Sequence, residues 1–160
     1  MASDSGRRIS ELMELWAHVK VEMVVSGAEL VLFDPLEGYR DLAAAFGYGR
    51  AATGDRLYVI TAWNPGAEER EARFNRLDQA RMLLRLSRLG VGFFPSRGSA
   101  DGWEEPGTAF FSASDELATS LARRFGQLGY YSFSRSRGVC VDATGFVGAA
   151  PLRPLGFAPD

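Results

Sequence analysis

The stretch LYVITAWNPGAEE, residues 57–69, joins the strongest predicted strand of the chain to its longest predicted helix. Its first half is rich in β-branched and aromatic residues, which favour a buried strand. Pro65 lacks a backbone N–H and biases Asn64 away from the helical region, so the strand must end there. The sequence therefore predicts an exposed turn at Asn64, at a sheet edge, with Trp63 as a flat apolar wall beside it.

Patterns outside this stretch predict the remaining elements. Apolar residues at helical spacing predict three main helices, over residues 8–24, 67–89 and 114–125. Strand-forming runs occupy residues 29–35, 56–63, 91–95 and 108–113, and a hairpin is expected over 128–143. Residues 96–107 are rich in Gly, Ser and Asp and are expected to form a loop. Because strand pairs alternate with helices, we expect an α+β fold with a largely antiparallel sheet of about six strands.

The length of 160 residues suits one domain. We expect an N-terminal helix within residues 1–27, a single α+β domain over residues 28–147, and a proline-rich tail over residues 148–160.

Composition excludes several classes of function. The formal net charge of -2 gives no general attraction to nucleic acid. Arg81, Arg85 and Arg88 line one helical face, which we interpret as solvated. With one cysteine, Cys140, and one histidine, no zinc-binding or nucleophilic pattern is present, so we expect neither metal nor cofactor. No segment has the character of a signal peptide or a membrane span, so we expect a cytoplasmic protein without membrane contact.

Two asparagines, Asn64 and Asn75, lie at positions that an ordinary apolar core does not explain. Asn64 is either a turn residue that bonds local backbone or an exposed ligand contact. Asn75 lies about two turns into the long helix, on the same face as Met82 and Leu86. An amide on an apolar stripe needs partners, because unpaired burial costs ~1–3 kcal/mol. Asn75 is therefore either a core amide that bonds a neighbouring loop or a ligand contact at the mouth of a pocket.

The segment GWEEPG places Trp103 before Glu104 and Glu105. These carboxylates are either solvated loop residues or, if one faces a pocket, a general acid or base with a raised pKa. Gln127 follows a predicted helix stop at Gly126. Its side-chain amide either bonds a local backbone carbonyl group or points into the same ligand-binding cleft as Asn75 and Glu105.

The motifs ITAWNP, FNRLDQARMLL, GWEEPGTAFF and LARRFGQ together resemble a bacterial family called domain of unknown function 3293. The resemblance covers about residues 57–142. It carries over a set of positions, namely Trp63, Asn64, Pro65, Asn75, Trp103, Glu105, Phe125, Gly126 and Gln127. The chain departs from the family pattern after Glu105, where Pro106 and Gly107 replace a polar residue. The family has no assigned activity, so the resemblance names positions and no reaction.

Amides and a carboxylate beside tryptophan rings suit a small, planar, polar ligand, for which a nucleotide-like molecule is an example. We therefore expect a binding site that contains Trp63, Asn64, Asn75, Trp103, Glu105 and Gln127. One alternative is a metal-independent enzyme in which Glu105 is the general acid or base. The other is a protein-interaction module that binds through its first helix or its aromatic residues.

Overall fold

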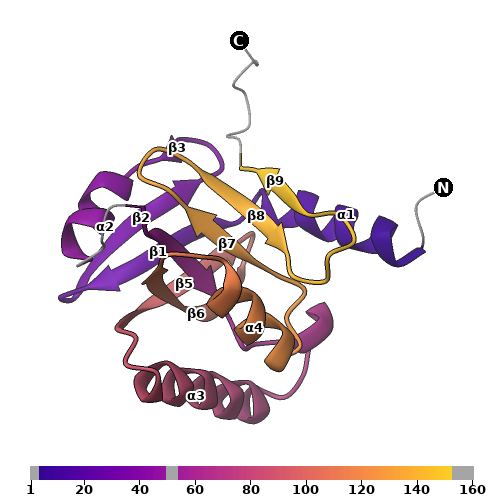
Figure 1. Cartoon of the computed structure of the whole chain (residues 1–160). Helices are drawn as coiled ribbons and strands as arrows, with labels where there is room; N and C mark the ends of the chain where they lie inside the picture. The colour runs from indigo at the N-terminus through magenta and orange to yellow at the C-terminus, as the bar shows by residue number, and fades with distance from the viewer. Residues whose placement is uncertain (1–3, 50–53, 153–160) are drawn as a thin grey trace.

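The computed structural model of the chain describes residues 4–49 and 54–152. In these ranges its elements follow the order α1 (Asp4–Trp16), β1 (Lys20–Val25), β2 (Ala28–Asp34), β3 (Gly38–Tyr39), α2 (Leu42–Tyr48), β4 (Arg56–Ile60), the 3-10 helix η1 (Pro65–Ala67), α3 (Ala72–Arg88), β5 (Phe93–Ala100), β6 (Trp103–Ser112), α4 (Glu116–Arg124), β7 (Gly129–Phe133), β8 (Gly138–Asp142) and β9 (Ala149–Pro151) (Figure 1). None of the helices described is both long enough and apolar enough to cross a membrane.

All of these strands belong to one sheet, in the order β3-β2-β1-β5-β6-β4-β7-β8-β9. Every neighbouring pair is antiparallel. The predicted α+β class with an antiparallel sheet is confirmed. The predicted number of about six strands is too low, because β1 and β9 fall in segments that were predicted as a helix and a tail, and β3 falls in a segment for which no strand was predicted.

The predicted helix over residues 8–24 is wrong in its second half. Helix α1 ends at Trp16, and β1 begins at Lys20. Val21, Met23 and Val25 are buried at a spacing of two, and β1 pairs with both β2 and β5. β-branched residues between two neighbouring strands favour this central strand over a helix.

The loop predicted over residues 96–107 is instead the hairpin of β5 and β6. The two strands pair from Phe93 opposite Phe110 to Ala100 opposite Trp103. The chain turns at Asp101 and Gly102, both of which have positive φ. Gly, Ser and Pro lower strand propensity, but continuous pairing to β1 and β4 on either side of the hairpin overrides it.

The tail predicted over residues 148–160 also begins as a strand. β9 pairs with β8, with Cys140 opposite Ala150. Residues 153–160 lie outside the described part of the chain.

The sheet curls until its two edges come close together (Figure 1). The hydroxyl of Tyr39, on edge strand β3, donates to the carbonyl oxygen of Leu152 at 2.6 Å, just beyond β9 at the other edge. The same hydroxyl lies 3.2 Å from the carbonyl oxygen of Gly138 at the start of β8. The curl therefore gives the sheet an inner face, which it encloses, and an outer face.

Each face has its own core. The inner core joins alternate residues of the strands to α1 and α2: Ile9, Met13, Val21, Met23, Phe33, Phe46, Leu57 and Phe133. The outer core joins the other side of β4, β6 and β7 to α3 and α4: Tyr58, Ile60, Met82, Leu86, Phe110, Leu121 and Tyr130. Because successive side chains of a strand point to opposite faces of the sheet, neighbouring residues lie in different cores. This alternation determines on which face each functional side chain lies.

The inner face is tightly filled at Gly129, the first residue of β7. A Cβ at this position would lie 2.5 Å from the Trp16 ring and 2.6 Å from the carbonyl oxygen of Val141. We expect Gly129→Ala to destabilise the fold by about 1–3 kcal/mol, as overpacking does. Urea unfolding measures this effect. The control is Gly92→Ala, where a Cβ meets nothing within 4 Å, and an equal loss in both variants would contradict this account of the packing.

Candidate functional site

The turn after β4 has an unusual backbone. Asn64 has φ 48° and ψ 60°, Gly66 has φ 69° and Ala67 has φ 59°. Left-handed conformations cost little for glycine and asparagine, but they are strained for alanine. This strain persists only where surrounding contacts hold the chain. Two such contacts are the Gly66 N–H bond to the carbonyl oxygen of Gly126, at 2.8 Å, and an Arg8 bond to the carbonyl oxygen of Gly66, at 3.2 Å.

Asn64 and Asn75 bond to each other in both directions. The backbone N–H of Asn64 donates to Oδ1 of Asn75 at 2.8 Å, and Nδ2 of Asn75 donates to Oδ1 of Asn64 at 2.8 Å. Asn75 is almost completely buried on the inward side of α3. Burial of an amide is tolerated when its partners are supplied, and here the turn supplies them. Asn75 therefore fixes the turn to the helix.

Arg70 is a third member of this contact, and no pattern in the sequence singles it out. Its Nε donates to Oδ1 of Asn75 at 2.7 Å, and its Nη2 pairs with Asp78 at 2.7 Å. Asp78 lies within α3, one turn after Asn75. This ion pair closes the segment between η1 and α3 over the two asparagines.

Gln127 reaches the same turn from the end of α4. Its Nε2 donates to the carbonyl oxygen of Trp63 at 2.9 Å. Gly126 before it has φ 67° and approaches Pro65 so closely that a Cβ there would lie 3.0 Å from the Pro65 Cβ. Asn64, Asn75 and Gln127, together with Glu105, are called the Asn64 cluster below.

Glu105 joins the cluster from β6. Nδ2 of Asn64 donates to its Oε2 at 3.3 Å. Strand alternation places Glu105 on the same side of β6 as Ala109, which belongs to the inner core, whereas Glu104 points to the outer face. The two adjacent carboxylates thus lie on opposite sides of the sheet.

Burial raises the pKa of Glu105 from its ordinary value of 4.5 to about 7. Hydrogen bonds with Thr61 and Asn64 lower the pKa, but they do not offset the loss of solvent. The carboxyl also lies close to Tyr131, whose pKa is raised by burial first, then by Cys140 and Glu105. Glu105 therefore titrates near neutral pH, and no cation is among the groups that shift it.

Trp103 lies two residues before Glu105 and on the same side of β6. Its ring covers Gly98, where a Cβ would lie 3.6 Å from the ring. Gly98 is the residue directly opposite Glu105 in the hairpin. The ring is 43% exposed, so it forms a partly open apolar wall beside the carboxyl.

Two buried donors near this end of the sheet have no hydrogen-bond partner within the described residues: Nε1 of Trp63 and Oγ of Ser96. Ser96 is on β5 opposite Gly107, and its hydroxyl occupies the space that a Gly107 side chain would take. Ser96 is thus a diagonal neighbour of Glu105 on the inner face. A serine in a predicted loop carried no signal that could have identified it from the sequence.

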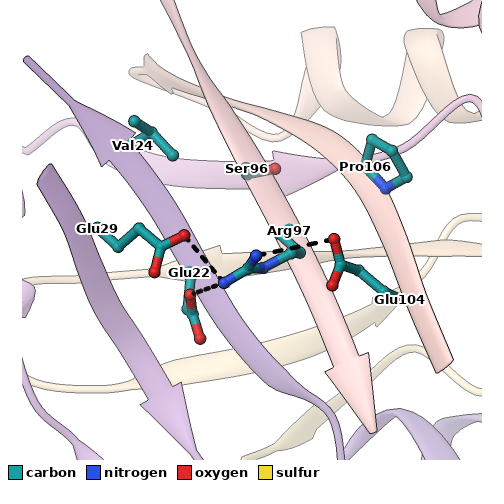
Figure 2. Close-up of a pocket in the computed structure, with 7 residues that line it drawn as sticks. All are labelled: Glu22, Val24, Glu29, Ser96, Arg97, Glu104 and Pro106. Carbon is teal, nitrogen blue, oxygen red and sulfur yellow. Dashed lines mark hydrogen bonds and ion pairs between the residues drawn. The ribbon is translucent and has the colours of Figure 1, made fainter. Parts of the chain in front are cut away.

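A pocket lies beside the central strands β1, β5 and β6 of the sheet (Figure 2). This pocket of about 200 Å³ is lined by Glu22, Val24, Glu29, Ser96, Arg97, Glu104 and Pro106. Arg97 lies between three carboxylates, at 2.7 Å from Glu22, 3.0 Å from Glu29 and 3.7 Å from Glu104. Burial alone would raise the pKa of Glu22, but hydrogen bonds from Lys20 and Arg97 lower it. Each of the three carboxylates in this pocket is paired with Arg97. In the Asn64 cluster, by contrast, no cation is among the groups that shift the pKa of Glu105.

Within residues 4–49 and 54–152, no three side chains of His, Cys, Asp or Glu gather in a way that could hold a metal ion.

The Asn64–Asn75 contact predicts a large loss of stability in Asn75→Ala. This substitution leaves the Asn64 N–H without its acceptor and opens a gap in the inward side of α3, so we expect a loss of about 2–3 kcal/mol. Chemical denaturation measures it. The control is Arg76→Ala, the exposed neighbour on α3, for which we expect less than about 0.5 kcal/mol. Similar values for the two variants would mean that the asparagine pair does not hold the turn.

The raised pKa of Glu105 predicts a specific pH dependence. Its folded-state pKa, about 7, lies above the ordinary 4.5, so its contribution is fully present below pH 4.5 and is lost as pH rises through 7. We expect Glu105→Gln to gain stability relative to the wild type between pH 5 and pH 8, by the order of 1–3 kcal/mol. Urea unfolding at both pH values tests this. A parallel Glu104→Gln series separates the buried carboxylate from its neighbour, and a constant difference for Glu105→Gln would refute the assignment.

Comparison with known proteins gives one result. Residues 60–129 match the model of a family described as protein of unknown function (DUF3293). This range contains the whole Asn64 cluster, together with Trp63 and Trp103. No curated protein and no solved structure gives a significant match. The resemblance drawn from the sequence motifs is confirmed over this range: residues 60–129 are similar to the DUF3293 family of proteins of unknown function.

Proposed function

We propose that the Asn64 cluster binds a small polar ligand, with Asn64 and Glu105 as its hydrogen-bonding contacts and Trp63 and Trp103 as apolar walls. The observation that carries the proposal is the environment of Glu105. A partly buried carboxyl with a pKa of about 7 lies beside an amide donor at 3.3 Å, and no cation shifts it. Burial of a carboxyl without a neighbouring cation lowers the free energy of unfolding. Such a carboxyl can bond a ligand in either protonation state.

The members of the cluster have different roles in this proposal. Asn75 uses its amide oxygen and nitrogen on Asn64 and Arg70, and Gln127 donates to the Trp63 carbonyl oxygen. These two residues orient the turn. The Glu105 carboxyl and the second N–H of the Asn64 side chain are left to contact the ligand, and the strained backbone at residues 64–67 fixes the position of Asn64.

Unused hydrogen-bonding capacity indicates the class of ligand. The acid form of Glu105 offers a donor, and its carboxylate form offers an acceptor. A planar molecule with both acceptors and donors along one edge, such as a nucleobase, can bond the Glu105 carboxyl in either form, and the partly exposed Trp103 ring can stack on its face.

A thermal-shift screen against nucleobases, nucleosides, nucleotides and planar amides tests the proposal. A ligand present at 100 times its dissociation constant adds ~2.7 kcal/mol, which raises the melting temperature by roughly 5–10 °C. We expect this shift to be lost in Glu105→Gln and kept in Glu104→Gln, its neighbour on the outer face. A screen without any shift, or a shift equal in both variants, would reject the proposal.

General acid–base catalysis by Glu105 is a second candidate, supported by the same pKa of about 7. It requires that the bound ligand be converted. We expect the rate to depend on a group that titrates near pH 7, and Glu105→Gln to lower kcat by about 10²–10⁴-fold. Mass spectrometry of the incubated ligand detects conversion. A ligand that binds but remains unchanged removes this candidate and leaves the binding proposal intact.

A further inference from the structure

Helix α3 has two different faces. Its inward face carries Asn75, Met82 and Leu86, all buried. On the opposite side, Leu77 is 47% exposed and Leu84 is 50% exposed. They are seven residues apart, so they lie on one stripe of the helix surface. In Figure 1, α3 is the outermost element on its side of the molecule.

Arginines flank the leucine stripe. Arg73, Arg81 and Arg88 are exposed on the same outward side of α3. The helix holds five arginines and one acidic residue, Asp78, which gives it a charge of +4, whereas the whole chain has a formal charge of -2. Positive charge is therefore concentrated on this helix.

Part of this charge is unpaired. Arg73 pairs with Glu71, and Arg81 pairs with Asp78. In the described ranges, Arg88 forms no ion pair. Singly exposed leucines are common on protein surfaces and need no explanation. Two aligned leucines bordered by three arginines form a mixed surface that a purely solvated helix does not require.

The composition of the stripe selects among possible partners. Nucleic acid would neutralise the arginines, but the leucines at the centre of the stripe are aliphatic and give its bases no aromatic platform for stacking. A second copy of α3 would cover the leucines, but it would bring two helices of charge +4 together. A protein segment with both acidic and apolar residues matches both features. Amphipathic helices are recognised in this way, through apolar anchors at helical spacing and complementary charges at the rim.

We propose that the outward face of α3 is a docking surface for an acidic amphipathic protein segment. The apolar residues of the partner cover Leu77 and Leu84, and its carboxylates pair with Arg73, Arg81 and Arg88. The surface lies on the side of α3 opposite Asn75, so it is separate from the Asn64 cluster. The inference therefore goes beyond the proposed ligand site and does not depend on it.

Fluorescence anisotropy with a designed probe tests this proposal. The probe is a labelled helical peptide as long as α3, with leucine at every third or fourth position and glutamate between. We expect binding that weakens as salt is added. We expect Leu77→Gln/Leu84→Gln and Arg81→Glu each to weaken binding by at least about tenfold. Matched controls are Leu15→Gln, a leucine 65% exposed on α1, and Arg137→Glu in the exposed turn before β8, and both are expected to bind like the wild type.

Two further probes separate the other partners. The first is a peptide of the same composition with its order scrambled, and the second is a labelled single-stranded RNA. Equal binding of the ordered and scrambled peptides, binding unaffected by the α3 substitutions, or stronger α3-dependent binding of RNA would each overturn the proposal. Circular dichroism of every variant confirms that α3 remains folded, because the substituted side chains lie on its exposed side.

Discussion

The reciprocal bond between Asn64 and Asn75 is the contact on which the candidate site depends. Pro65 ends β4, and the following residues turn through left-handed conformations that the chain adopts only under constraint. Asn75 supplies that constraint from inside α3, and Arg70 and Gln127 reinforce it from two further directions. One side-chain pair thus joins a strand end to a helix. It also leaves Nδ2 of Asn64 directed at Glu105.

The hairpin of β5 and β6 gives two neighbouring carboxylates opposite properties. Glu104 points outward, where Arg97 approaches it at 3.7 Å (Figure 2). Glu105 points inward, where burial dominates and the pKa rises to about 7. The same residue type is therefore part of an ion network on one face of the sheet and a buried acid that titrates near pH 7 on the other. Strand alternation alone produces this separation.

Much of the fold followed from the sequence, and the reasons for the exceptions are specific. The strand before Pro65 and the long helix after it were predictable because periodicity and a proline break agree there. The helix predicted through Val21 was wrong because Met and Val occur in either element, and the neighbouring strands decide between them. The hairpin that carries Trp103 and Glu105 was mistaken for a loop because its pairing is not local. Ser96 and Arg70 were missed because only tertiary contacts give them a role, whereas Asn64, Asn75 and Glu105 were noticeable as polar residues in unexpected places.

The closure of the sheet by Tyr39 has a consequence for the order of events during synthesis. Its hydroxyl joins residues separated by 113 positions in the chain, so this contact has one of the largest loop-closure costs available to the molecule. The contact can form only after Leu152 has left the ribosome. Until then, a nascent chain that already holds β1 to β7 has an open sheet, and its inner core remains accessible to water and to chaperones. The final strand therefore determines when the domain becomes protected.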